Sequence, residues 1–183
     1  MAAQGNLIPV YGDFLCDTET PVSAYLKIKE KSFSYLLESA DRDKKWGRYS
    51  FIGYKPYLTA LSHNRSMELV KGKERKVLKD IRDPMDVLRK LTKQFKPVIM
   101  HDLHPFQGGM VGYFNYDLIR KWEYLPAVSP EDITVPESIL TISRCLIIFD
   151  HFTHKSKVVV FVHLENHDHL KEAYDLARQE VDE

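Results

Sequence analysis

The residues with the clearest chemical potential lie between Leu36 and Ser50. The run Leu36-Leu37-Glu38-Ser39 is followed, after a polar stretch, by Tyr49-Ser50-Phe51-Ile52, so a carboxylate and two hydroxyls stand among apolar residues typical of a core. An unpaired buried polar group costs about 1–3 kcal/mol, and a buried charge costs more. Two strand-like runs joined by a polar loop therefore predict that Glu38, Ser39 and Ser50 need partners, which a small zwitterionic ligand could supply.

The same side chains also fit a strand that binds no ligand. Consecutive side chains of a strand point to opposite faces, which would place one of Glu38 and Ser39 in water and the other in a packed wall. Periodicity by itself favours this structural interpretation. A ligand site therefore needs support from beyond the strand pattern.

A glycine-rich segment, Gly108-Gly109-Met110-Val111-Gly112, superficially suggests a phosphate-binding loop. Neither Lys-Ser nor Lys-Thr follows it, and its spacing differs from the dinucleotide-binding fingerprint. Glycines interleaved with apolar residues instead allow a strand to bend or another backbone to approach closely. We expect a structural role for this segment.

Eight histidines raise the question of a metal site. Several of them lie at a predicted turn or near a strand end and a helix start: His151, His154, His163, His167 and His169. Metal-binding pairs on one helical face usually stand at i and i+4, and no acidic or cysteine residue has a recognisable metal spacing. We expect solvated or capping histidines, and we expect Asp150 to cap a turn rather than join a catalytic triad.

Three helices are predicted, and each has a start signal. Thr20-Pro21 opens the first and Asp83-Pro84 the second, because a polar cap followed by proline is typical of a helix start. The third begins near Asn166 or Asp168 and ends the chain. Their inward faces comprise, in order, Val22, Tyr25 and Lys29; Leu88, Leu91 and Phe95; and Leu170, Ala173, Tyr174, Ala177 and Val181.

Alternating and β-branched runs predict antiparallel strands between these helices. Residues 33–37 are expected to neighbour residues 49–52. A hairpin is expected at Asn64-Arg65 between residues 58–63 and 67–70, with a further turn at Lys71-Gly72-Lys73. Residues 139–149 and 157–164 form another predicted pair. The chain is therefore expected to be one α+β domain of mostly antiparallel sheet with a few packed helices.

Composition narrows the class of protein. Lys+Arg and Asp+Glu both number 26 among 183 residues, so there is no basic excess of the kind that binds nucleic acid. No apolar run approaches the ~20 residues that span a bilayer, and the N-terminus lacks the pattern of a signal peptide. We expect a cytoplasmic protein without nucleic-acid or membrane partners, in which Cys16 and Cys145 are reduced structural thiols.

The chain resembles the N-terminal domain of anthranilate synthase component I. That family carries Leu-Leu-Glu-Ser and, after ten intervening residues, Ser, as Leu36 to Ser39 and Ser50 do here. The other matching blocks, which run in the same order along nearly the whole chain, are Ile8-Pro9-Val10-Tyr11, residues 17–27, residues 106–120 with Glu123, Leu125 and Pro126, and Phe149-Asp150-His151. Two positions depart from the family: Tyr49 stands where some members have Lys, and Ser143-Arg144 where many have an acidic residue.

The resemblance implies a regulatory domain rather than a catalytic one. The family enzyme converts chorismate and an ammonia donor to anthranilate and pyruvate with magnesium bound in its C-terminal domain, which would be absent from residues 1–183. The implied ligand is L-tryptophan. Glu38 would pair with its ammonium or orient the loop, the hydroxyls of Ser39 and Ser50 would hold the loop shape and reach its polar end, and Leu37 would lie beside its indole. No catalytic residue, metal ligand or cofactor is expected in this segment, and by itself it should be inactive. The implied partners are the C-terminal domain and a glutamine amidotransferase subunit, component II.

Two other functions remain open. The sister enzyme aminodeoxychorismate synthase component I shares the fold, but the block at residues 17–27 and the complete Leu-Leu-Glu-Ser and Ser50 pattern argue against it. The second is a free-standing amino-acid-binding module. Tryptophan inhibition and the product formed would separate the first from anthranilate synthase, and the presence of a chorismate-binding domain would exclude the second.

Overall fold

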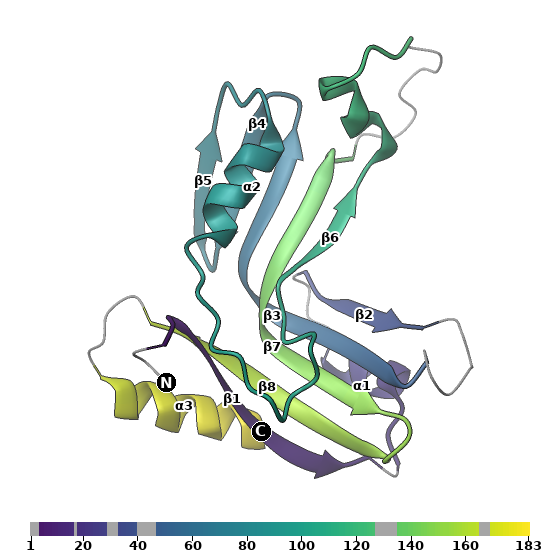
Figure 1. The fold of residues 1–183 in the computed structure, drawn as a ribbon, viewed down its shortest axis with the longest axis vertical. Coiled ribbons are helices and arrows are strands. Elements are labelled where there is room, and N and C mark those ends of the chain that lie inside the picture. The colour runs from purple at the N-terminus through teal and green to yellow at the C-terminus, as the bar shows by residue number, and fades with distance from the viewer. Residues whose placement is uncertain (1–3, 17, 29–32, 40–46, 127–134, 165–168) are drawn as a thin grey trace. The chain divides into compact units, whose positions relative to one another are not determined.

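The computed structural model describes residues 4–16, 18–28, 33–39, 47–126, 135–164 and 169–183. Figure 1 shows the elements of this part of the chain, which are β1 (Leu7–Leu15), α1 (Pro21–Ile28), β2 (Tyr35–Glu38), β3 (Tyr49–His63), β4 (Ser66–Lys71), β5 (Glu74–Leu78), α2 (Pro84–Thr92), β6 (Met110–Phe114), the 3-10 helix η1 (Tyr116–Lys121), β7 (Ser138–Asp150), β8 (Lys155–His163) and α3 (Leu170–Asp182).

The strands form an antiparallel sheet. Hydrogen-bonded neighbours follow the order β1-β8-β7-β3-β4-β5, while β2 pairs with β3 and β6 pairs with β7. The pairs β1–β8, β2–β3, β3–β4, β4–β5, β6–β7 and β7–β8 are all antiparallel. The predicted fold class, α+β with mostly antiparallel sheet and a few packed helices, is confirmed.

Contacts divide the chain into two compact units. Unit 1 contains residues 1–56, 95–109 and 143–183, and unit 2 contains residues 57–94 and 110–142. Strands β3 and β7 contribute residues to both units. All the residues expected to bind a ligand belong to unit 1.

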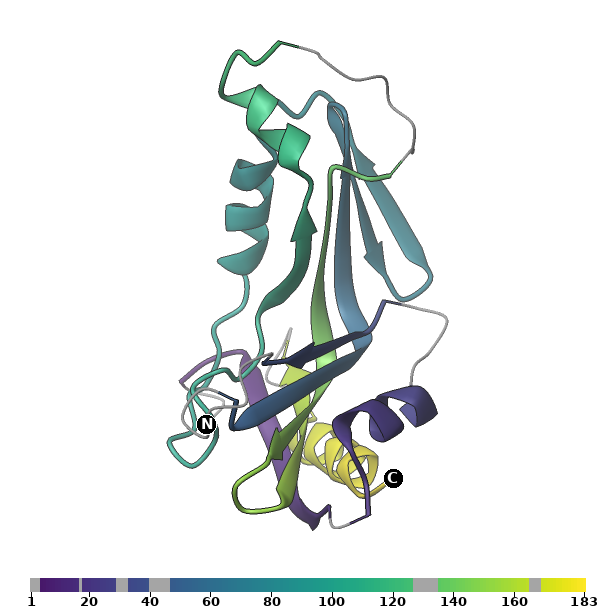
Figure 2. The ribbon, with the colours of Figure 1, turned by 90° about the vertical axis from the view of Figure 1, so that its right-hand side faces the viewer.

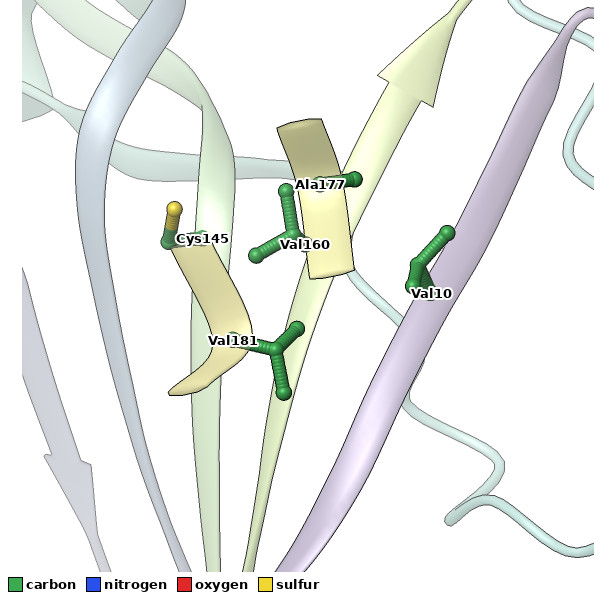
Figure 3. Close-up of a cluster of buried hydrophobic side chains, with 5 residues drawn as sticks. All are labelled: Val10, Cys145, Val160, Ala177 and Val181. Atoms are coloured by element: carbon green, nitrogen blue, oxygen red, sulfur yellow. The ribbon is translucent and has the colours of Figure 1, made fainter. Parts of the chain in front are cut away.

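In unit 1, α3 packs on one face of the sheet. Ala177 and Val181 of the helix meet Val10, Cys145 and Val160 of β1, β7 and β8 (Figure 3). The predicted inward face of α3 was too wide, because Leu170 and Tyr174 are exposed. The expected caps Asn166 and Asp168 lie outside the described residues, and His169, which has no side-chain capping bond, precedes the helix.

A second core of unit 1 lies on the opposite sheet face. Leu146 and Val159 directly neighbour Cys145 and Val160 along their strands, and consecutive strand residues face opposite sides. They pack with Leu103, Ile148 and Phe161. Residues 100–106, which include Leu103, contribute to this core and bring a loop onto that face.

In unit 2, α2 covers the sheet. Its start is fixed by Asp83, whose side chain accepts a hydrogen bond from the Met85 amide at 2.8 Å, with Pro84 at the first helical position. Leu88 packs with Ala60, Met67 and Leu140. The predicted helix was too long, since α2 ends at Thr92 and Phe95 belongs to unit 1, where its ring lies 5.0 Å from that of His163.

Both predicted tight turns are confirmed. Asn64 between β3 and β4 and Gly72 between β4 and β5 have φ of 54° and 58°, in the left-handed region that these two residues tolerate. The two strands predicted at residues 49–52 and 58–63 are in fact one, because β3 continues through Gly53 and Pro56, with a positive φ of 49° at Lys55 in between.

The glycine-rich segment has a structural role. Gly108 and Gly109 have φ of 101° and 137°, and a Cβ built on Gly112 would lie 1.8 Å from the carbonyl oxygen of Ile139. The backbone that approaches Gly112 so closely belongs to the neighbouring strand β7, which contains Ile139.

Both cysteines are free, as expected. Cys145 is fully buried, and its thiol lies 3.6 Å from the carboxylate of Glu180 on α3. Burial raises the pKa of the Cys145 thiol to about 12. The Cys16 thiol donates to the Ser156 hydroxyl at 2.9 Å.

Arg144, one of the two departures from the family pattern, forms an ion pair with Glu180 at 2.8 Å.

Candidate functional site

Strands β2 and β3 bring the two ends of the motif together. They pair antiparallel with Glu38 opposite Ser50 and Leu37 opposite Phe51, and Figure 2 shows β2 beside the first part of β3. Directly opposed residues point to the same face of a sheet, so Glu38 and Ser50 share one face and Leu37 and Phe51 the other. The pairing of these two runs, predicted from sequence, is confirmed.

Burial differs sharply between the motif residues. Ser50 is 2% exposed, whereas Leu37 is 39% exposed and both Glu38 and Ser39 are exposed. The expectation that all three polar groups lie in a core is therefore right for Ser50 and wrong for Glu38 and Ser39. Strand β2 pairs only with β3 among the described residues, and an edge strand leaves its end open to solvent.

The polar side chains also differ in their partners. Within the described part of the chain, the side chains of Glu38 and Ser39 form no hydrogen bond or ion pair. The Ser50 hydroxyl, by contrast, lies 2.8 Å from Nε2 of His151, which follows β7 directly. The backbone amide of His151 in turn donates to the carbonyl of Arg48 at 2.9 Å.

Arg48 and Asp150 form a bidentate ion pair beside this contact. Nε and Nη2 of Arg48 donate to the two carboxylate oxygens at 2.9 and 2.6 Å. Asp150 also accepts from the amides of Phe152 and Thr153 at 3.0 and 3.4 Å, which confirms its predicted role in capping a turn. The guanidinium and these amides hold the pKa of the Asp150 carboxyl well below its usual range.

Aromatic side chains cover the other face of β3. The ring of His104 lies 4.4 Å from that of Tyr49 and 5.0 Å from that of Phe51, and Phe106 meets Phe51 edge-on at 5.0 Å. Burial lowers the pKa of His104. Its Nδ1 accepts from the Phe106 amide at 3.0 Å, which fits a neutral imidazole. Tyr49, where some family members have lysine, is therefore part of this aromatic packing.

A cavity of about 360 Å³ lies within unit 1 beside Arg48 and Tyr49, and none of Leu37, Glu38, Ser39 and Ser50 is among the residues that line it. Its walls include residues of β3, of the loop over the sheet and of the β7–β8 turn: Arg48, Tyr49, His104, Asp150, Thr153 and Lys155. Sequence analysis missed Arg48 and His104 as members of this region. No local pattern could have indicated them, because Arg48 meets a partner 102 residues away.

No metal centre is formed by the described residues, since none of their His, Cys, Asp and Glu side chains gather in groups of three or more that could hold an ion. His167 lies outside the described residues. Among the helices described, none combines the length and the apolar character needed to cross a membrane.

The chain is similar to anthranilate synthase component 1 from several organisms. The protein of that name from Acetivibrio thermocellus is 35% identical over 95% of this chain, and that from Aquifex aeolicus (strain VF5) is 36% identical over 94%. The chain spans about a third of the length of these curated relatives, 35% in both cases. No protein-family model matches the chain.

A solved structure shows the same fold. Anthranilate synthase component I from Streptococcus pneumoniae TIGR4 superposes with a TM-score of 0.54 at 21% identity, over 92% of this chain and 34% of the other. Fold and strand pairing therefore show that this chain is built like one segment of that larger protein. At about 35% identity along nearly its whole length, the chain is similar to about a third of anthranilate synthase component 1.

Proposed function

We propose that this chain is the N-terminal regulatory domain of anthranilate synthase component I and that it binds L-tryptophan for feedback inhibition. One observation carries the proposal: the pairing of β2 with β3 places the Glu38 carboxylate opposite Ser50, at a strand end where Glu38 and Ser39 have no side-chain partner among the described residues. The ammonium of a zwitterionic amino acid supplies a positive charge and N–H donors, with which a carboxylate and a hydroxyl can interact.

Each motif residue has a role that its position supports. The exposed carboxylate of Glu38 pairs with the ligand ammonium, a charge-assisted bond that contributes about 1.5–3 kcal/mol. The Ser39 hydroxyl reaches the ligand's polar end. Ser50 holds the shape of the site from its buried position, and Leu37, 39% exposed, offers apolar surface to the indole.

The remaining proposals concern a longer protein. The family reaction converts chorismate and ammonia, delivered by the component II amidotransferase, to anthranilate and pyruvate with magnesium. Tryptophan would bind an inactive arrangement of the enzyme more tightly than an active one and so shift the population, a coupling typically worth about 1–3 kcal/mol. Residues 1–183 supply the regulatory site, and the chorismate and magnesium sites lie outside them.

The two alternatives receive less support. Both curated relatives described above are named anthranilate synthase component 1, which favours that enzyme over aminodeoxychorismate synthase. A free-standing amino-acid-binding module is less favoured because the relatives that match nearly the whole chain are named as a component of an enzyme.

Substitutions in the full-length enzyme test the proposed site. Ser39→Phe fills the space beside Glu38 and removes a hydroxyl, and we expect at least a tenfold weaker inhibition by tryptophan, which corresponds to about 1.4 kcal/mol of binding. Glu38→Ala should act in the same direction by leaving the ligand ammonium unpaired. The measurement is a tryptophan inhibition curve of anthranilate formation for each variant beside the parent.

Glu74→Ala provides the matched control, because Glu74 is an exposed glutamate on another edge strand, β5, and belongs to unit 2. Tryptophan should inhibit the Glu74→Ala variant as strongly as it inhibits the parent. Unchanged inhibition in both Ser39→Phe and Glu38→Ala would show that these residues are purely structural, and the proposed site would be wrong.

A further inference from the structure

The Ser50 hydroxyl is already engaged within the protein. It is 2% exposed and lies 2.8 Å from Nε2 of His151, at a normal hydrogen-bonding distance. This contact uses one of the hydroxyl's hydrogen-bonding sites, and an exposure of 2% leaves little of the Ser50 side chain open to a ligand. Ser50 is therefore better placed to support the site than to contact what binds there.

The β7–β8 turn holds this part of β3 by three separate interactions. Besides the Ser50 contact, the His151 amide donates to the Arg48 carbonyl at 2.9 Å, and the two carboxylate oxygens of Asp150 accept from Nε and Nη2 of Arg48. Bidentate guanidinium–carboxylate pairs fix orientation as well as distance. Both the backbone and the side chains at the start of β3 are thus tied to residues 150 and 151.

The position of Glu38 depends on the same contacts. Strand β2 has four residues and pairs only with β3 among the described strands, with Glu38 directly opposite Ser50. A short edge strand has no second neighbour to fix it, so a shift of β3 at Ser50 moves Glu38 as well.

We propose that His151 is a positioning residue: by binding the Ser50 hydroxyl it fixes the end of the β2–β3 pair and thereby the exposed Glu38 and Ser39. The ligand part of this inference rests on the proposed function, whereas the effect on strand pairing does not. The effect on strand pairing and the effect on ligand binding both depend on the hydrogen bond between His151 and Ser50. A side chain at position 151 that restores this bond should therefore restore both.

Hydrogen exchange of the ligand-free, full-length protein tests the strand effect. In His151→Ala we expect the amides of residues 35–38 and 50–53 to exchange at least fivefold faster than in the parent. His151→Gln, whose amide can bond to the Ser50 hydroxyl, should recover most of the protection. The control is His154→Asn, because His154 lies in the same turn with a φ of 54° that asparagine tolerates; its exchange in these strands should match the parent. Unchanged exchange in His151→Ala would overturn the inference.

Calorimetric titration of the same proteins with L-tryptophan tests the effect on the site. We expect at least fivefold weaker binding for Ser50→Ala and His151→Ala, with the double variant no weaker than the weaker single, because both lose the same contact. His151→Gln should bind within twofold of the parent. Additive losses in the double variant would overturn the inference, since Ser50 would then contact the ligand independently. A parent that bound no tryptophan would contradict the proposed function, while the exchange result would still decide the role of His151.

Discussion

Asp150 shows how one side chain can make the stability of this protein depend on pH. Its folded-state pKa is lowered chiefly by the hydrogen bonds from Arg48, and its unfolded value is about 3.9. A lowered folded-state pKa means that the ionised form stabilises the fold. That stabilisation is present above about pH 4 and is lost as the pH falls through the lowered pKa.

Replacing Asp150 with asparagine should remove this dependence. Asp150→Asn is expected to lower the free energy of unfolding at pH 7 by about 1–2 kcal/mol, a modest figure because the Arg48 side chain is 39% exposed. The difference from the parent should shrink at pH 3 and below. Urea unfolding at both pH values measures it.

Asp86→Asn is the control, since Asp86 and Arg89 form an ion pair in which both side chains are 64% exposed. Its effect should be small at either pH. An Asp150→Asn difference that grew as the pH fell would contradict the assigned sign.

At the scale of elements, the contact between β6 and β7 depends on the absence of a side chain at Gly112. A Cβ there would lie 1.8 Å from the Ile139 carbonyl oxygen and 2.8 Å from its carbon, so backbone would have to move. Strand β6 pairs with β7 alone among the described strands and so has no second neighbour to keep it in place.

Gly112→Ala is therefore expected to destabilise unit 2 by about 3 kcal/mol or more, within the range of large single-residue effects. Gly72→Ala is the matched comparison. Gly72 has a positive φ of 58° but nothing within 4 Å of its Cβ position, so only a backbone cost of about 1 kcal/mol applies. Urea unfolding measures the free energy of unfolding of both variants. Equal losses of stability in the two variants would contradict the close contact between β6 and β7 at Gly112.

At the scale of the whole molecule, the chain matches about a third of its curated relatives, 35% of each. We expect residues 1–183, purified by themselves, to form no anthranilate from chorismate, ammonium and magnesium, because the proposed chorismate and metal sites lie outside them. Anthranilate fluorescence measures the product, with a full-length anthranilate synthase as the positive control. Turnover above the protein-free blank would contradict the assignment of this segment as regulatory.

The sequence by itself determined the local elements and the likeness to anthranilate synthase component 1. Helix starts at Thr20-Pro21 and Asp83-Pro84, turns at Asn64 and Gly72, and the neighbouring motif strands were all predictable, because capping, left-handed turns and alternation depend on residues close together in the chain. The same local rules misjudged the lengths of two elements, because β3 continues through Pro56 and α2 ends before Phe95.

Only the tertiary structure decided which polar groups of the motif are buried and what they contact. Ser50 is enclosed while Glu38 and Ser39 are open, since β3 lies inside the sheet and β2 at its edge. The partners of Ser50 and Arg48 lie 101 and 102 residues away, in a turn that reaches them only because β3 and β7 are neighbours. Burial and long-range hydrogen bonds follow from strand order, which no short stretch of sequence contains.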